Sequence, residues 1–156
     1  MTNYISEANP LVNSQLKLPE YFHERIQNYV TLQTGGGPTD ERRPFGRVVD
    51  FWFLAVCIGA HFNERKTLSG KDWDFNTGVV LSQHPDKIQL LELLAIADND
   101  DTPQDSIKTA GKVAEIANMY AAGGTELLIQ WLDAKGGASV GDLIGDKIHD
   151  IIDNPQ

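Results

Sequence analysis

The sequence predicts an all-α protein, a compact orthogonal or bundle-like array of about five to six helices. Apolar residues recur at helical spacing in successive segments of the chain, and short loops containing Gly or Pro separate these segments. No heptad repeat is sustained, so a compact array is favoured over a long coiled coil.

Length and composition are those of one ordinary domain. The 156 residues are 41% hydrophobic, enough to bury roughly two thirds of the unfolded surface without a metal or disulfide. We expect a flexible N-terminal tail over residues 1–17 and a single helical domain over residues 18–153. The start lacks the pattern of a signal peptide, and no apolar run approaches the roughly 18 residues of a membrane helix. These features predict a cytoplasmic protein with no membrane partner.

The first predicted helix begins at Pro19 and continues to about Leu32. Its apolar residues recur at helical spacing, at Tyr21, Phe22, Ile26, Tyr29 and Val30. The run TGGGPTDERRP then ends the helix, because three glycines followed by Pro38 cannot continue it. No Gly-Lys-Ser/Thr follows, so we interpret this run as a surface loop and not as a phosphate loop.

The second predicted helix, from about Phe45 to Asn63, is apolar around nearly its whole circumference. Such a helix should lie at the centre of the domain. Asp50 is the exception, and a carboxylate in these surroundings needs a partner, for which Arg47 and Arg43 are the local candidates.

Two further features of this helix concern packing. Gly59 and Ala60 form a small face that another helix can approach closely. Cys57, the only cysteine of the chain, lies between Val56 and Ile58. We therefore expect a buried and unreactive thiol.

The segment after Lys66 is rich in turn residues, but Trp73 and Phe75 alternate with polar residues. This alternation indicates a short extended strap that its aromatic side chains pin to the core. The next residues, VVLSQHP, are ambiguous between strand and irregular structure. A third helix then begins at Pro85, with a buried side formed by Ile88, Leu91, Leu94 and Ala95.

The acidic run at residues 98–101 resembles the start of a calcium-binding loop, but the match fails. Pro103 stands where such a loop requires Gly, and Thr109 stands where it requires Glu. We interpret the run as a solvated turn that caps the next helix.

Three more helices complete the prediction. The fourth runs from about Pro103 to Ala122 and ends at Gly123 and Gly124. Thr125 caps a fifth, which Gly136 and Gly137 close, and Ser139 begins the last. The apolar residues of this last helix are Val140, Leu143, Ile144, Ile148, Ile151 and Ile152.

Charge is distributed unevenly along the chain. The formal net charge is −9, but residues 1–78 carry 8 Lys and Arg against 9 Asp and Glu, whereas residues 79–156 carry 5 against 13. All five arginines lie in the first half. Any contact with phosphate must come from that half, because the second half repels a polyanion.

No segment carries a catalytic signature. The four histidines, His23, His61, His84 and His149, do not form a metal-ligand spacing with each other, with Cys57 or with carboxylates. A nucleophile elbow and a dinucleotide fingerprint are also absent from the sequence. We predict a protein that is not an enzyme and that needs no cofactor and no metal.

Two blocks of the chain resemble a known family. They are PFGRVVDFWFLAVCIGAHFNERKTL, at residues 44–68, and IANMYAAGGTELLIQWL, at residues 116–132. An aromatic-rich helix after Pro-Phe, and a later Tyr-Ala-x-Gly-Gly junction, resemble the small accessory proteins associated with DNA phosphorothioation (Dnd) gene clusters. The resemblance covers about residues 40–135. It implies a role in bacterial DNA sulfur modification, or in the restriction and antiphage defence linked to it, and implies no reaction.

Three hypotheses about function follow, of which the last is an enzyme with an unrecognised active site. The first is a non-catalytic accessory subunit that binds protein subunits of a modification or restriction complex, with the acidic half as a docking face for a basic partner. The alternative is a DNA-binding module that could act as a homo-oligomer. Its candidate residues for contacting DNA phosphates are Arg42, Arg43, Arg47, Arg65 and Lys66. The opposing interpretation pairs Arg47 with Asp50 and places Arg65 at a helix C-terminus.

Overall fold

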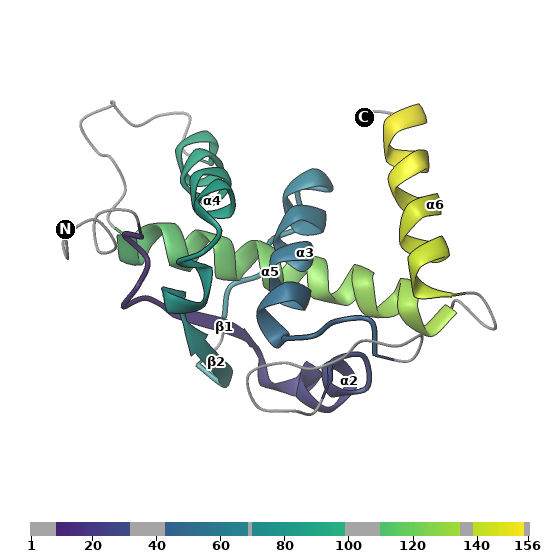
Figure 1. The fold of residues 1–156 in the computed structure, drawn as a ribbon, viewed down its shortest axis with the longest axis horizontal. Coiled ribbons are helices and arrows are strands. Elements are labelled where there is room, and N and C mark those ends of the chain that lie inside the picture. The colour runs from purple at the N-terminus through teal and green to yellow at the C-terminus, as the bar shows by residue number, and fades with distance from the viewer. Residues whose placement is uncertain (1–8, 32–42, 69, 99–109, 135–138, 155–156) are drawn as a thin grey trace.

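The computed structural model describes residues 9–31, 43–68, 70–98, 110–134 and 139–154 (Figure 1). Within these ranges the chain forms β1 (Gln15–Pro19), η1 (Glu20–Phe22), α2 (His23–Gln27), α3 (Val48–His61), β2 (Asp72–Thr77), η2 (Gly78–Leu81), α4 (Pro85–Ala97), α5 (Ala110–Ala134) and α6 (Val140–Asp153). The protein is mostly helical, as predicted. The all-α class is nevertheless wrong in part, because β1 and β2 pair as a two-stranded antiparallel sheet.

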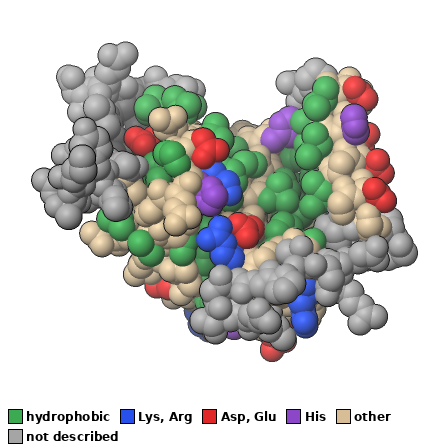
Figure 2. Space-filling model, in the orientation of Figure 1, with side chains coloured by type: hydrophobic (Ala, Val, Ile, Leu, Met, Phe, Trp, Pro, Cys, Tyr) green, Lys and Arg blue, Asp and Glu red, His purple; other side chains and the backbone are tan. Residues whose placement is uncertain are grey.

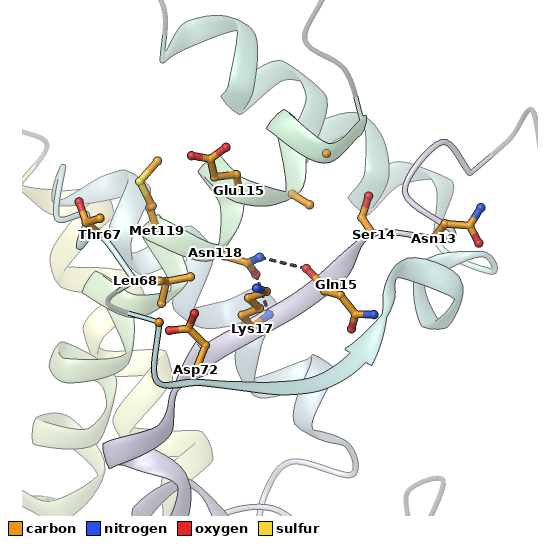
Figure 3. Close-up of a pocket in the computed structure, with 13 residues that line it drawn as sticks. Asn13, Ser14, Gln15, Lys17, Thr67, Leu68, Asp72, Glu115, Asn118 and Met119 are labelled. Atoms are coloured by element: carbon orange, nitrogen blue, oxygen red, sulfur yellow. Dashed lines mark hydrogen bonds between the residues drawn. The ribbon is translucent and has the colours of Figure 1, made fainter.

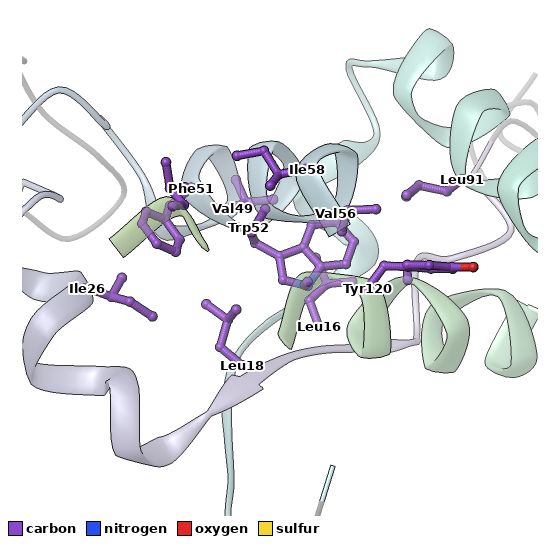
Figure 4. Packing of buried hydrophobic residues seen from close by; sticks show 14 of the residues in the cluster. Leu16, Leu18, Ile26, Val49, Phe51, Trp52, Val56, Ile58, Leu91 and Tyr120 are labelled. Atoms are coloured by element: carbon purple, nitrogen blue, oxygen red, sulfur yellow. The ribbon is translucent and has the colours of Figure 1, made fainter. Parts of the chain in front are cut away.

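α5 is the base on which the other elements are arranged. α4, α3 and α6 each contact it, in that order along its length, and all three project from one side of it (Figure 1). β1 also contacts α5. The hydrophobic core lies where α3, α5 and β1 meet, with the fully buried Trp52 at its centre and Leu16 and Leu18 of β1 beneath it (Figure 4).

α5 is continuous through Gly123, Gly124 and Thr125, where the sequence predicted that one helix ends and another begins. That prediction is wrong, because these glycines meet a neighbouring backbone and form no turn. A Cβ atom at Gly124 would lie only 1.8 Å from the Ala55 carbonyl oxygen of α3. Thr125 caps no helix, since its hydroxyl donates to the Ala121 carbonyl at 2.7 Å. The expected helix ends at Pro103 and at Gly136 and Gly137 lie outside the described residues.

α3 is the central helix that the sequence predicted, although it is shorter than expected. Residue 63, the predicted end, has a positive φ of 52° and lies just beyond it. The small face at Gly59 is confirmed, because a Cβ atom there would lie 2.1 Å from the Tyr120 carbonyl oxygen of α5. Glycine on both helices therefore lets the backbones of α3 and α5 touch.

The first helix, predicted from Pro19 to about Leu32, is confirmed only over α2. Pro19 ends β1, residues 20–22 form η1, and α2 stops before Val30, which forms a β-bridge with Phe45. Leu16 and Leu18 are buried, whereas Gln15 is exposed, so this stretch buries one side of a strand. Asn118 of α5 fixes the strand, since its Oδ1 accepts from the Lys17 amide at 2.8 Å and its Nδ2 donates to the Gln15 carbonyl at 3.0 Å. These long-range contacts outweigh the local helical pattern.

Part of the segment expected to form a flexible tail, residues 1–17, is ordered. Leu11 is fully buried, and the buried Asn9 donates to the Gly78 carbonyl at 2.8 Å. A Cβ atom at Gly78 would lie 1.9 Å from the Leu11 carbonyl oxygen, so the two backbones are in contact. Residues 9–17 thus belong to the domain, while residues 1–8 lie outside the described part of the chain.

The extended strap with Trp73 and Phe75 is confirmed as β2, and both aromatic rings pack against the core. The ambiguous residues that follow form η2 and pair with no strand. α4 begins at Pro85, and α6 begins after Ser139, whose hydroxyl accepts from the Asp142 amide at 3.1 Å. Both of these helix starts were predicted from the sequence.

Candidate functional site

Among the cations predicted to contact phosphate, those that the structure describes lie at the two ends of α3, and several pair with carboxylates. Arg47 pairs with Asp50 at 3.2 Å, as the opposing interpretation predicted. Arg65 pairs with Asp98 at the end of α4 and lies over the Tyr120 ring, 5.7 Å from its centroid.

The other three candidates for phosphate contact are Lys66, Arg43 and Arg42. Lys66 pairs with Glu126 of α5. Arg43 is half-buried and also interacts within the chain. Arg42 lies outside the described residues. Phosphate binding by this set stays a prediction, and three of its members would first have to leave a carboxylate.

A cavity of about 540 Å³, lined by both polar and apolar side chains, lies between β1, β2 and the first half of α5 (Figure 3). Its charged lining residues are Lys17, Asp72 and Glu115, of both signs. The buried Oδ1 atom of Asp72 has no hydrogen-bond partner among the described residues. The described lining includes no histidine and no cysteine.

A second concave surface, which we name the α3/α6 groove, is almost entirely apolar. It encloses about 250 Å³ and is lined by Leu54, Cys57, Ile58 and His61 of α3, Trp131 of α5, and Ile144, Lys147, Ile148 and Ile151 of α6. A neighbouring hollow of about 470 Å³ shares His61, Trp131, Lys147 and Ile151 with it. Figure 2 shows the hydrophobic side chains gathered between α3 and α6.

The groove exists because α6 buries its apolar side incompletely. None of its described side chains is fully buried, although Leu143, Ile144 and Ile151 are partly covered. Ile148 and Ile152 keep 49% and 66% of their surface exposed. The helix therefore presents an apolar stripe that the rest of the described chain does not cover.

Cys57 lies on the α3 wall of the groove, where its side chain is exposed. The prediction of a buried thiol is wrong, because the apolar circumference of α3 extends beyond the area that α5 covers. Partial burial among apolar neighbours raises the pKa of the Cys57 thiol, although the nearby Lys87 ammonium lowers it.

The outer side of α6 is acidic. Asp142, Asp146, Asp150 and Asp153 are all exposed, and their spacing places them on one side of the helix, adjoining the apolar stripe. Figure 2 shows acidic side chains along the edge of α6 that faces away from α3. The one lysine of α6, Lys147, points inward instead, with its Nζ atom 5.3 Å from the centroid of the Trp131 ring.

At the far end of α5, a polar cluster attaches α2. Asp133 accepts hydrogen bonds from the Tyr29 hydroxyl and from the Arg25 guanidinium. Burial and the bond to Asp133 raise the pKa of Tyr29 to about 12, and the bond from Tyr29 lowers the pKa of Asp133. This cluster holds the end of α5 from which the chain continues to α6.

Comparison with known proteins adds no relative: the chain matches no protein-family model, no curated protein and no solved structure. Among the described residues, no helix has the length and apolar character needed to cross a membrane. The same residues contain no group of three or more His, Cys, Asp or Glu side chains placed to hold a metal ion.

The apolar residues of α6 were identified from the sequence, but the groove was not predicted. The signal that could have found the groove is the arrangement of this last helix, in which acidic residues and isoleucines divide its circumference between them. Which part of the apolar stripe stays uncovered depends on where α6 packs against α5, and this is a tertiary property.

Proposed function

We propose that this protein is a non-catalytic subunit that binds a protein partner through the α3/α6 groove. The observation that carries the proposal is the exposure of Ile148 and Ile152 beside an apolar hollow lined by Cys57, Ile58 and Trp131. Exposed apolar surface of this kind typically marks an interaction site. The family resemblance supplies the setting, a DNA sulfur-modification or linked restriction complex, which stays part of the proposal.

The energy of exposed apolar area supports this function. Water in contact with apolar surface costs about 25 cal/mol for each Å². Covering Ile148, Ile152 and the groove wall with a partner would therefore contribute favourably to the free energy of binding. The core residues of α3 and α5 gain nothing further from a partner, because they are already buried.

DNA binding is the weaker alternative. Arg47, Arg65 and Lys66 are each paired with a carboxylate, and the groups at the two ends of α3 form two separate patches. The acidic side of α6 would also repel a polyanion. A salt-dependent titration with labelled duplex DNA, intact and phosphorothioated, would support this alternative if binding weakens steeply with salt and is lost on Arg43→Ala.

Co-purification from cells that carry the native gene neighbourhood tests the main proposal. Tagged wild-type protein should retain a stoichiometric partner that the double variant Ile148→Lys/Ile152→Lys loses. The matched control is Leu93→Lys on α4, since Leu93 is 61% exposed and lies outside the groove. Both substitutions lie at exposed sites, so each variant should fold with a stability within about 0.5 kcal/mol of wild type. A partner that both variants retain would contradict the proposal.

A further inference from the structure

The α3/α6 groove has two helical walls that end on the same base helix. α6 has 14 residues, which corresponds to about 21 Å of wall at 1.5 Å for each residue. Its uncovered apolar positions, Ile148 and Ile152, are four residues apart and so lie one above the other along the wall. A surface with this spacing matches the side chains of another helix, whose apolar residues also recur every three to four positions.

The charge beside the groove restricts what that helix can be. α6 carries Asp142, Asp146, Asp150 and Asp153 against the single Lys147, a net charge of −3 with His149 neutral. Asp150 also lines the hollow that adjoins the groove. A helix lying along the apolar stripe would bring its flanking side chains to this acidic side, where Lys and Arg are favoured and Asp and Glu are repelled.

From these observations we infer that the groove binds an amphipathic helix of a partner protein whose residues beside the apolar face are basic. The inference rests on the proposed docking function and specifies the partner's chemistry. The aliphatic walls would take the partner's Leu, Ile or Met side chains, and the aspartates of α6 would take its Lys and Arg side chains.

A second copy of the chain fits the groove poorly. Pairing two α6 helices would bring two rows of aspartate together, and α4, which exposes Leu90, Leu93 and Ile96, carries Asp86 and Glu92 against one Lys87 and is not basic either. Like charges at this distance cost energy and give no compensating ion pair. An anionic membrane surface is disfavoured by the same acidic row, because helices that bind such surfaces carry Lys and Arg on their polar side.

Three synthetic 16-residue peptides test the inference by fluorescence anisotropy. The first has leucines at helical spacing flanked by lysines, the second replaces each lysine by glutamate, and the third carries a central proline in the basic sequence. We expect the basic peptide to bind wild-type protein at least about fivefold more tightly than the acidic one at low salt, with the difference shrinking at high salt. The proline peptide should bind weakly, because it cannot form the helix.

Protein variants identify the surface responsible. Asp146→Lys/Asp150→Lys should reverse the preference between the basic and acidic peptides, and Ile148→Lys should abolish binding of both. Leu93→Lys on α4 should leave both affinities unchanged. Equal affinity for the basic and acidic peptides, or undiminished binding of the proline peptide, would overturn the inference.

Self-association is the remaining outcome, and analytical ultracentrifugation tests it. A dimer that Ile148→Lys dissociates would show a second copy in the groove and would also overturn the inference. Failure of every peptide, with the native partner still lost from Ile148→Lys/Ile152→Lys, would overturn the basic-helix inference and leave the docking function standing. A native partner retained by that variant would instead remove the docking function itself.

Discussion

α3 and α6 both contact α5, but α3 packs closely against it whereas α6 does not. α3 packs against α5 at a glycine, Gly124. A Cβ atom added there would lie only 1.8 Å from the Ala55 carbonyl oxygen. α3 buries seven of its residues, including the whole of Phe51 and Trp52. α6 also contains glycines, Gly141 and Gly145, but a Cβ atom at either would have no neighbour within 4 Å.

The difference shows that glycine has two unrelated structural roles in this chain. At the α3/α5 contact, glycine permits two backbones to touch, and the pair forms the scaffold of the domain. In α6, glycine permits no contact and only weakens the helix. The apolar side of α6 therefore contributes little to the scaffold and remains available for a partner.

The largest expected effect is that of Gly124→Ala. The new methyl group would overlap the Ala55 carbonyl, and backbone atoms cannot move aside as a flexible side chain can. We expect a loss of about 3 kcal/mol or more in the free energy of unfolding, measured by urea denaturation. A loss below about 1 kcal/mol would show that α3 and α5 are not in contact at this glycine.

The next largest effect is expected for Asn118→Leu, which conserves volume and removes a buried amide. Its Oδ1 accepts from the Trp52 indole at 3.1 Å and from the Lys17 amide at 2.8 Å, and these donors would lose their partner. We expect a loss of about 2 to 4 kcal/mol by the same measurement. Glu115→Ala, at an exposed site of the same helix, is the control and should change stability by less than about 0.5 kcal/mol.

Gly145→Ala should change stability in the opposite direction to Gly124→Ala. No atom opposes the added methyl group, and alanine favours the helix by about 0.5 to 1 kcal/mol. Amide hydrogen exchange should show slower exchange confined to α6, with the amides of α3 and α5 unaffected. Faster exchange in α6 would mean that this face of the helix is covered in solution.

The smallest effects concern pH and the cluster that attaches α2. Because the folded-state pKa of Asp133 is lowered, its contribution to stability is complete above the ordinary value of 3.8 and disappears as the pH falls below it. The raised pKa of Tyr29 has the opposite sign, so its contribution is complete below pH 10 and is lost as the pH rises toward about 12.

Tyrosine absorbance at 295 nm measures the ionisation of the Tyr29 hydroxyl directly. The difference between wild type and Tyr29→Phe should titrate near pH 12. In Asp133→Asn the titration of Tyr29 should move to lower pH, because the carboxylate that holds the phenol proton is gone. A Tyr29 titration at pH 10 in both proteins would show that the cluster does not form in solution.

The parts of the fold that were predictable are those determined by local sequence. Pro85 and Ser139 are local signals for a helix start, and the alternation around Trp73 predicts an extended segment. The prediction was wrong where contacts with an element distant in sequence determine the local conformation. Gly124 resembles a helix end until Ala55 of α3 is known to lie against it, and Pro19 resembles a helix start until it is known to pair with Asp72 of β2.

The candidate site was less predictable than the fold, for the same reason. Arg47 and Asp50 are three residues apart, and their pairing was predicted. The partners of Arg65 and Lys66 lie 33 and 60 residues away, so the sequence could not identify them. Cys57 was placed in the core because its neighbours are apolar, but burial depends on the area that α5 covers.

Alkylation of Cys57 provides the most direct test of the docking account, because this residue is the only cysteine and lies on the groove wall. Its reaction rate with iodoacetamide can be compared between the isolated protein and the complex purified with the native partner. The account predicts that the partner slows alkylation in proportion to the fraction bound, and that Ile148→Lys/Ile152→Lys abolishes the protection. An unchanged rate in the fully formed complex would show that the partner binds elsewhere and would contradict the account.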